Sequence, residues 1–298
     1  MLELLNNCKL CPRNCNINRN NKIGFCKATN TVKVARAALH YYEEPCISGQ
    51  KGSGTVFFSN CNLKCVFCQN YQISTCNNGK EITIERLSTI FLELQKKGAL
   101  NINLVTPTHY VPQIIEALKI AKENGLSIPI IYNTSSYENV ETIKLLKDYI
   151  DIYLPDFKYY DNDLAKKYSN ANNYFEHASK SIKQMVKQTK KIVFDKNGIM
   201  QKGIIIRHMI LPGYINDSKK IIKYIYDNYK DKVYISIMNQ YTPLDNVKNF
   251  PEINRKVSKK EYDEVVNYAI ELGINNGFIQ EGDTAKESFI PIFDNEGV

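Results

Sequence analysis

The chain has 298 residues, of which 43% are hydrophobic and 23% are charged, as expected for a soluble globular protein with a large core. No stretch approaches the roughly 18 apolar residues of a membrane helix, and the opening MLELLNNCKL carries an acid and no basic region, unlike a signal peptide. The net charge of +8 comes from scattered lysines, which argues against a nucleic-acid patch, so we expect a cytoplasmic protein without membrane or nucleic-acid partners.

All nine cysteines lie within the first 76 residues, which favours metal binding over a disulfide framework. Residues 1–48 have many polar residues and little periodicity. Four of their five cysteines follow the pattern C-x2-C-x3-C-x10-C, namely Cys8, Cys11, Cys15 and Cys26. Four thiols complete either a structural zinc site or a 4Fe-4S cluster, and spacing does not choose between the two. We predict a small metal-binding module over 1–48, followed by a main domain over 49–298.

The surroundings of these four cysteines leave simpler explanations open. Unliganded thiols would also persist in a reducing cytoplasm. Arg13 and Arg19 would offset the negative charge of a thiolate centre, although ordinary surface arginines fit the sequence equally well. Gly24 would let the returning chain turn close to the centre. We expect Cys46 and Cys76, which stand apart from the closely spaced cysteines, to bind no metal.

A second group of cysteines follows the first predicted buried strand, TVFFS at 55–59. The loop CNLKCVFCQN places Cys61, Cys65 and Cys68 within eight positions, with Phe67 directly before the last cysteine. Four thiols would close a zinc site or occupy every corner of an iron-sulfur cube, so three predict a metal centre with one position left for another ligand. A zinc site with one external ligand is the competing interpretation.

Short β-branched runs alternate with helical patterns from residue 81 onward. We predict further strands at 101–106, 128–134, 151–156, 203–211, 232–238 and 277–280. We predict helices at 84–98, 111–125, 138–148, 216–229 and 258–273, with a mostly helical insertion before residue 203. Such serial alternation predicts an α/β protein with a parallel sheet and right-handed crossovers. About six βα units are too few for a complete eight-fold barrel, so we expect a partial (β/α)6 parallel barrel.

The motif Cys61-x3-Cys65-x2-Cys68 after a strand resembles the cluster motif of the radical S-adenosylmethionine (radical SAM) superfamily. The resemblance implies that the three thiolates hold a 4Fe-4S cluster and that the amino and carboxylate groups of SAM bind its fourth iron. It also implies that an electron from the cluster breaks a C–S bond of SAM and releases a 5′-deoxyadenosyl radical.

Further segments are similar to the poorly characterised family related to pyruvate formate-lyase activating enzymes, over nearly the whole chain. They are EEPCISGQKGSGTVFFSNCNLKCVFCQNYQIS, NLVTPTHYVPQI, YNTSSYE, LPDFKYYD, IRHMILPG and IMNQYTP. One departure is Asn60, since that family usually has glycine before the first cluster cysteine. This change could alter the tight turn, but it leaves the thiolates intact.

A second departure, shared with that family, follows the second strand. Many radical SAM enzymes carry Gly-Gly-Glu there to hold the SAM amino group, whereas this chain reads Thr106-Pro107-Thr108-His109. Thr106 and Thr108 offer oxygen acceptors to an ammonium group, and Pro107 fixes the turn. His109 is either a SAM or substrate contact or an ordinary loop histidine.

Polar residues at the ends of the next strands complete the SAM site that the resemblance implies. Asn133 and Ser135 end the third strand, and Asp156 and Lys158 end the fourth, where a ribose diol and a carboxylate need polar partners. The pair Asp156 and Lys158 aligns with the Asp-x-Lys of the activating enzymes. A neighbouring surface ion pair is the simpler explanation for these two residues.

Arg207 and His208 lie inside an apolar strand, where alternation sends the two side chains to opposite faces. One of them therefore faces the barrel interior, and a buried cation there needs an anionic partner such as the SAM carboxylate. Gln240 and Gln280 are further candidates for cofactor contacts. For both, a buried and hydrogen-bonded amide is the alternative.

The resemblance predicts an anaerobic enzyme that abstracts hydrogen from a substrate, with an electron donor such as flavodoxin or ferredoxin. Similarity to the activating enzymes predicts glycyl-radical installation on a partner protein. The cysteine-rich N-terminal module is unlike the minimal activating enzymes and keeps open the alternative of radical modification of a small molecule or peptide. From another class, a zinc-stabilised, non-catalytic binding protein on a degenerate barrel is the remaining interpretation.

Overall fold

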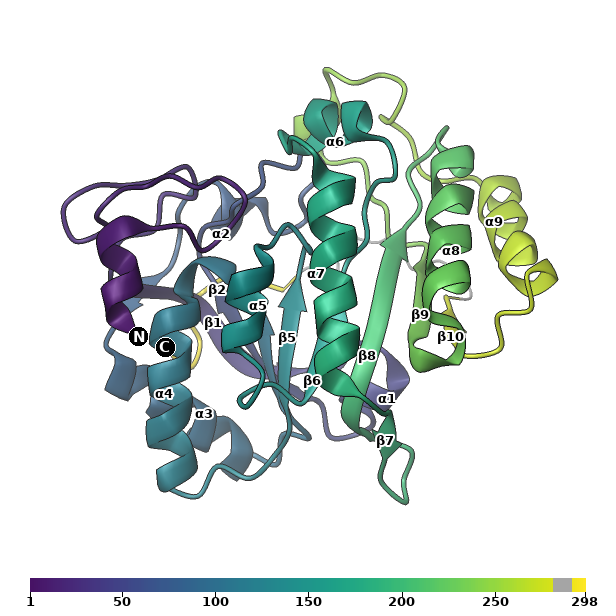
Figure 1. The fold of residues 1–298 in the computed structure, drawn as a ribbon. Helices are drawn as coiled ribbons and strands as arrows, with labels where there is room; N and C mark the ends of the chain where they lie inside the picture. The colour runs from purple at the N-terminus through teal and green to yellow at the C-terminus, as the bar shows by residue number, and fades with distance from the viewer. Residues whose placement is uncertain (281–290) are drawn as a thin grey trace.

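The computed structural model describes residues 1–280 and 291–298. Within these ranges ten strands form one sheet, and parallel pairing runs through it in the order β10-β9-β8-β6-β5-β4-β2 (Figure 1). These strands are β2 Ser53–Phe58, β4 Ile102–Val105, β5 Ile130–Thr134, β6 Ile152–Pro155, β8 Met200–Met209, β9 Tyr234–Met238 and β10 Gly277–Ile279. The predicted α/β class and parallel sheet are confirmed, because each predicted strand is present within a few residues of its expected bounds.

Three antiparallel strands are absent from the sequence prediction: β1 Val32–His40, β3 Lys80–Ile82 and β7 Val193–Phe194. β1 pairs with β2 and β3, and β7 pairs with β8. β1 was not predicted because apolar and polar residues do not alternate regularly along it. Most of the strand is buried on both faces, and three of its residues are alanines. This strand belongs to the main sheet, while the predicted division of the chain at residue 48 stays a prediction.

Most helices cover one face of the parallel sheet (Figure 1). The longer ones are α3 Ile84–Lys96, α4 Val111–Glu123, α7 Tyr174–Thr189, α8 Ile215–Tyr229 and α9 Lys259–Glu271, and the shorter ones are α1 Pro45–Ser48, α2 Tyr71–Ser74, α5 Val140–Leu145 and α6 Asn162–Ser169. Four 3-10 helices are η1 Leu2–Asn7, η2 Thr108–Tyr110, η3 Lys230–Lys232 and η4 Asp245–Val247. Side-chain caps begin α3 and α9: Thr83 accepts a hydrogen bond at the start of α3, and Ser258 and Glu261 form a capping box on α9.

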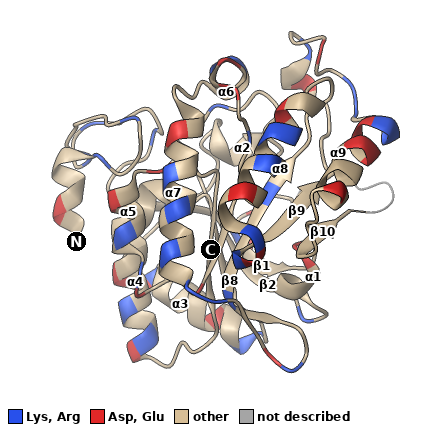
Figure 2. Cartoon of the chain, turned by 45° about the vertical axis from the view of Figure 1, so that its right-hand side comes forward, with Lys and Arg blue, Asp and Glu red and all other residues tan. Residues whose placement is uncertain are grey.

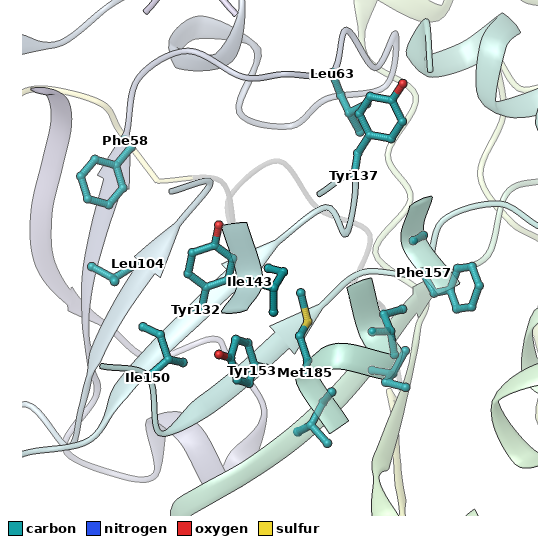
Figure 3. Packing of buried hydrophobic residues seen from close by; sticks show 14 of the residues in the cluster. Phe58, Leu63, Leu104, Tyr132, Tyr137, Ile143, Ile150, Tyr153, Phe157 and Met185 are labelled. Atoms are coloured by element: carbon teal, nitrogen blue, oxygen red, sulfur yellow. The ribbon is translucent and has the colours of Figure 1, made fainter. Parts of the chain in front are cut away.

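The two faces of the sheet have different surroundings. On the helix-facing side, Leu104, Tyr132 and Tyr153 pack among residues such as Ile143 of α5 and Met185 of α7 (Figure 3). The alternate strand positions face the barrel interior, where a smaller apolar cluster consists of Cys46, Ile47, Ile131, Ile152, Leu154, Met200 and Ile205. Because Cys46 and Ile47 belong to α1, this short helix closes the end of the interior at which the parallel strands begin.

Basic and acidic residues mix along the outer helices, as Figure 2 shows for α4, α7 and α8. The net charge is therefore not gathered on these helices into one basic face. Within the described residues, none of the helices has the length and apolar character needed to cross a membrane.

Candidate active site

The three-cysteine loop starts directly after β2, at the end of the sheet opposite α1 (Figure 1). Asn60 precedes its first cysteine with φ +77°, in the left-handed region that glycine enters freely and asparagine tolerates better than most residues. The Asn60 N–H donates to the carbonyl of Ile73 at 2.8 Å. The turn expected of glycine is therefore kept with asparagine in its place.

Each sulfur of the loop has a polar hydrogen beside it. The pairs are Leu63 N–H with Cys61 Sγ at 3.3 Å, Ser169 hydroxyl with Cys65 Sγ at 2.9 Å, and Ser74 hydroxyl with Cys68 Sγ at 3.3 Å. Hydrogen bonds of this kind stabilise metal-bound thiolates and tune the potential of iron-sulfur centres. The donor set of the loop therefore fits a cluster held by three thiolates.

Burial raises the pKa of Cys61 to about 12 and that of Cys65 to about 11, and the neighbouring thiols add to both shifts. Metal-free, the loop thus holds neutral thiols, which must lose their protons when they bind a metal. Among the described residues, no group of three or more His, Cys, Asp or Glu side chains is arranged to hold a metal ion as it stands. The three thiols are close neighbours, not a closed ligand set.

A buried network of charges lies beside the loop, at the ends of β6 and β8. Lys158 Nζ lies 2.7 Å from Asp156 Oδ2, and Arg207 Nη2 lies 2.8 Å from Asp156 Oδ1. Arg207 also donates to Asn133 Oδ1 at 2.7 Å. The side chains of Asp156 and Lys158 are each 16% exposed and that of Arg207 is 13% exposed. Asp156 and Lys158 are therefore not a surface ion pair.

Electrostatics explains why the Asp156 carboxylate is stable there. Burial by itself would raise the pKa of Asp156, but Arg207 and Lys158 outweigh burial and hold the pKa below its usual range. Lys158 also lies close enough to Cys65 to lower the pKa of that thiol. The network therefore places positive charge next to the loop, where thiolates would form.

Arg207 extends the network to Glu43, in the segment between β1 and α1. Its Nη1 lies 3.1 Å from Glu43 Oε2, and Asn103 of β4 donates to Glu43 Oε1 at 3.0 Å. Burial raises the pKa of Glu43, with Arg207 acting in the opposite direction. The charges thus continue from the cysteine loop down into the barrel interior.

Comparisons with known proteins concern the same part of the chain. The sequence model of the radical SAM superfamily matches residues 55–225, more than half of the chain. The chain belongs to the radical SAM superfamily. It is 30% identical over 276 residues to an uncharacterised protein of Methanocaldococcus jannaschii, covering 90% of this chain and 75% of that protein. It is also 28% identical over 178 residues to the pyruvate formate-lyase-activating enzyme of Clostridium pasteurianum, covering 56% of this chain and 65% of the enzyme.

Solved structures share the fold of this radical SAM protein. SuiB of Streptococcus suis, bound to its precursor peptide SuiA, matches with a TM-score of 0.51 and 15% identity over 75% of this chain and 47% of SuiB. The FeFe-hydrogenase maturase HydG of Carboxydothermus hydrogenoformans matches with a TM-score of 0.52 and 10% identity over 79% of this chain and 56% of HydG. The chain spans about half the length of both. At these identities the likeness concerns the fold, and it confirms the predicted partial barrel.

Membership of the radical SAM superfamily implies a 4Fe-4S cluster and SAM as cofactors, and it supports an enzyme. The residues that follow β4 show how this chain differs from the Gly-Gly-Glu pattern. Thr106 has φ +59°, a strained conformation for a β-branched residue, and its N–H donates to the Asn133 carbonyl at 2.9 Å. Strain of this kind concentrates at functional sites, which supports the predicted SAM contact at Thr106.

The 3-10 turn η2 directs the next two side chains elsewhere. The Thr108 hydroxyl donates to Glu138 Oε1 at 2.6 Å, on the helix-facing side. His109 Nε2 lies 2.8 Å from the Ser59 carbonyl, while the buried Nδ1 has no partner among the described residues. His109 also lines a cavity with the four N-terminal cysteines. The hydrogen bonds of Thr108 and His109 thus lie outside the charged network, and we leave both residues out of the proposed SAM site.

Arg207 and His208 face opposite sides of the sheet, as alternation predicts. His208 lies on the helix-facing side, where Nδ1 lies 2.7 Å from the Phe157 carbonyl and Nε2 lies 2.9 Å from the Ser218 hydroxyl of α8. Burial lowers the pKa of His208 to about 4, so the ring is neutral. Both nitrogens are already bonded, and we also leave His208 out of the proposed SAM site.

The remaining candidates lie around the same end of the barrel. The Gln240 carbonyl accepts a hydrogen bond from Gln69 of the cysteine loop at 2.8 Å. The Gln280 side chain accepts one from the Asn239 N–H at 2.7 Å, which fits the simpler interpretation of a bonded amide. The Ser135 carbonyl accepts one from the Tyr174 hydroxyl at 2.8 Å.

The N-terminal segment packs beside the three-cysteine loop. Arg13 Nε donates to the Asn62 carbonyl within that loop at 2.9 Å, and the Arg13 guanidinium lies 3.7 Å from the centre of the Phe25 ring. Arg19 is buried and donates to the carbonyls of His109 and Thr29. The two arginines are therefore docking residues and not ordinary surface arginines.

One cavity is lined by all four N-terminal cysteines: Cys8, Cys11, Cys15 and Cys26. A Cβ atom added to Gly24 would lie 3.1 Å from Cys15 Sγ, so glycine permits the close approach expected of it. Cys46 lies apart in α1, and Cys76 is exposed. The four thiols thus line one cavity, and a metal site there stays a prediction.

Sequence reasoning missed the acidic residues Glu43 and Glu44 and their neighbour Asn103. A signal was available, because the acidic pair lies between a strand and a proline-initiated helix. This signal could not be used without β1, which does not alternate regularly between apolar and polar residues. Glu138, which binds three hydroxyl groups on the helix-facing side, was missed as well.

Proposed function

We propose that this protein cleaves SAM reductively and uses the resulting radical to abstract hydrogen from a substrate in the barrel interior. The observation that carries the proposal is the cysteine loop beside the buried network of Asp156, Lys158 and Arg207. Cys61, Cys65 and Cys68 would hold the 4Fe-4S cluster, which would supply one electron to SAM, so that a C–S bond breaks to give methionine and a 5′-deoxyadenosyl radical. An electron donor such as flavodoxin or ferredoxin would supply that electron.

The chain's own residues would bind and orient SAM. Asp156 accepts and Lys158 donates hydrogen bonds, which suits the hydroxyl groups of a ribose. Arg207 is a planar donor that suits a carboxylate, and Asn133 Oδ1 fixes its orientation. Thr106, held by the Asn133 carbonyl, would meet the SAM amino group.

Anaerobically reconstituted protein with a reductant should convert SAM to 5′-deoxyadenosine and methionine. Cys65→Ala should abolish this product, because losing one thiolate leaves an iron unligated and destabilises the cluster. Cys76→Ala is the matched control, since this exposed thiol lies outside the loop and should leave turnover unchanged. Undiminished 5′-deoxyadenosine formation by Cys65→Ala would refute the assignment.

Two substrate classes remain as proposals. Similarity to the activating enzyme of Clostridium pasteurianum favours installation of a glycyl radical on a partner protein. The buried polar interior around Glu43 favours the alternative, radical modification of a small molecule or peptide. Electron paramagnetic resonance after incubation with a candidate partner separates the two, because only the first leaves a stable radical on the partner.

We also propose that Cys8, Cys11, Cys15 and Cys26 bind zinc or a second 4Fe-4S cluster. Closure by four thiolates would leave no position for SAM, so the role would be structural or electron transfer. The double variant Cys11→Ala/Cys15→Ala should lose about one zinc or one cluster's worth of iron. The double variant Cys46→Ala/Cys76→Ala is the control, and equal metal content in both would count against the site.

A further inference from the structure

Two glutamates enter the barrel interior from the segment between β1 and α1. The Glu43 side chain is 10% exposed and is held by Arg207 and Asn103. Glu44 is 8% exposed, and Ser236 of β9 acts to lower the pKa of its carboxyl group, against the larger effect of burial. Glu44 is the N-cap of α1 and Glu43 precedes it, so both residues belong to the end of the sheet opposite the cysteine loop (Figure 1).

Two buried acceptor atoms at this place have no partner among the described residues. They are Glu44 Oε2 and Asn103 Oδ1. A buried acceptor without a donor costs about 1–3 kcal/mol, and more if it is charged. Such atoms are normally bonded to ordered water or to a ligand. Both residues neighbour Glu43, because Asn103 donates a hydrogen bond to Glu43 and Glu44 follows it in the chain.

In this interior the acidic groups outnumber the cations, and burial raises the pKa of both Glu43 and Glu44, which disfavours their charged forms unless a cation pairs with them. Among the residues that the structure describes, three carboxyl groups and two cations are connected here: Glu43, Glu44, Asp156, Lys158 and Arg207. If all five are ionised, one negative charge remains. A cation with N–H donors would neutralise that charge and also supply hydrogen bonds to both unpaired acceptors.

We propose that Glu44 and Asn103 form a subsite that binds a primary ammonium group of the substrate. The proposal rests on the proposed function, since it names the substrate chemistry of the same barrel. Water satisfies the acceptors but leaves the charge, and a quaternary ammonium neutralises the charge but donates no hydrogen bond. A primary ammonium does both. Glu43 acts as a positioning residue that holds Arg207 and Asn103 around the subsite.

The probe for this subsite is methylammonium, observed by saturation-transfer NMR on the full-length reconstituted protein without reductant, with and without SAM. Methylammonium should bind, and tetramethylammonium at equal ionic strength should bind about tenfold more weakly because it donates no hydrogen bond. Glu44→Gln should weaken methylammonium binding by about tenfold or more. Glu138→Gln is the matched control and should leave it unchanged, since Glu138 is also buried with one unpaired oxygen but lies on the helix-facing side.

Three outcomes would overturn the subsite. Equal binding of the two cations to the unmodified protein would show that charge alone acts, and this comparison does not depend on the folding of any variant. Equal methylammonium binding by Glu44→Gln and the unmodified protein would show that water fills the acceptors. Loss of binding when SAM is added would assign the acceptors to SAM. The 5′-deoxyadenosine assay is separate, so selective methylammonium binding without SAM cleavage would refute the proposed function and leave the subsite standing.

Discussion

Two buried carboxyl groups on opposite faces of one sheet have opposite pKa shifts. Asp156, in the barrel interior, is paired with Arg207 and Lys158, and its pKa lies below the usual range. Glu138, on the helix-facing side, accepts hydrogen bonds from three hydroxyl groups, and its pKa is raised to about 7. The three donors are Thr108 at 2.6 Å, Thr134 at 2.5 Å and Tyr132 at 3.1 Å.

Burial raises the pKa of both groups, so the difference comes from what surrounds them. The hydroxyl groups lower the pKa of Glu138, but they carry no net charge and offset only part of the desolvation. The cations beside Asp156 outweigh the desolvation of that carboxylate. The surroundings of Asp156 thus stabilise a charge, whereas the helix-facing side holds a carboxyl group that is about half protonated at pH 7.

The largest expected effect follows from removing the cation that the interior carboxylates share. Arg207→Met leaves Asp156 and Glu43 buried without it, so the free energy of unfolding should fall by about 3–5 kcal/mol. The loss should be smaller at low pH, because protonation of the two acids relieves the unpaired charge. Urea unfolding at pH 5.5 and pH 8 measures both effects. Arg207→Lys keeps a cation, so its free energy of unfolding should fall less. If the loss in Arg207→Met were the same at both pH values, buried unpaired carboxylates would not be its cause.

Glu138→Gln tests the other face of the sheet. The folded pKa of Glu138 is about 7 and its ordinary value is 4.5, so the folded state binds the proton more tightly than the unfolded state. The stability that this provides is complete below pH 4.5 and is lost as the pH rises toward 7. Relative to the unmodified protein, Glu138→Gln should therefore gain up to about 3 kcal/mol in free energy of unfolding between pH 5 and pH 8.

Glu141→Gln is the control for this prediction. Glu141 lies exposed on α5, where it pairs with Lys144, and the side chain is 80% exposed. Its replacement should change the free energy of unfolding by the same small amount at both pH values. If Glu138→Gln behaved in the same way, its carboxyl group would not be the one that titrates near neutral pH.

Much of the fold was predictable because parallel strands and their covering helices have distinct patterns. The strand ending at Pro155 is a short apolar run, and α9 begins with the Ser258 and Glu261 capping box, so both could be identified from local sequence. β1 could not, because residues such as Ala35, Ala37 and Ala38 are buried without alternation. Its place depends on pairing with β2 on one side and β3 on the other, which local sequence does not encode.

The candidate site was predictable only where cysteine spacing or strand alternation determines in which direction a side chain points. Alternation along β8 correctly separates Arg207 from His208. No such rule applies to Thr108 and His109, because the short turn η2 rotates their side chains away from the strand ends. Glu43 was missed for another reason: its contact with Arg207 joins positions 164 residues apart.

Lys158→Met removes one of the two cations beside Asp156 and should have a smaller effect than Arg207→Met. Asp156 keeps its contact with Arg207 and should stay ionised, while the proposed SAM site loses one charged donor. A charge-assisted hydrogen bond contributes about 1.5–3 kcal/mol, so the dissociation constant of SAM should rise by roughly 10- to 100-fold. Calorimetric titration measures the affinity, and iron content per chain should stay unchanged.

Lys219→Met is the control for that titration, since Lys219 pairs with Glu264 on the outer helices and should not affect SAM binding. Equal SAM affinity of Lys158→Met and the unmodified protein would mean that the Lys158–Asp156 pair serves the fold and not the cofactor.

The smallest expected effect concerns a single hydroxyl group on the helix-facing side. Tyr132 makes the longest of the three hydrogen bonds to Glu138, and its hydroxyl lowers the pKa of that carboxyl group. Tyr132→Phe should therefore raise the pKa further and cost about 1 kcal/mol of unfolding free energy at pH 8, where the carboxylate needs the donor. At pH 5 the Glu138 carboxyl group is protonated in both proteins, so the loss of unfolding free energy should be smaller.

Tyr153→Phe is the control, because it removes a hydroxyl of similar burial on the same face. That hydroxyl is bonded to Gln188 and not to Glu138, so the loss of unfolding free energy should be the same at both pH values. Urea unfolding of the two variants decides the matter: if Tyr132→Phe showed no more pH dependence than Tyr153→Phe, the hydroxyl groups would not be what limits the charge on Glu138.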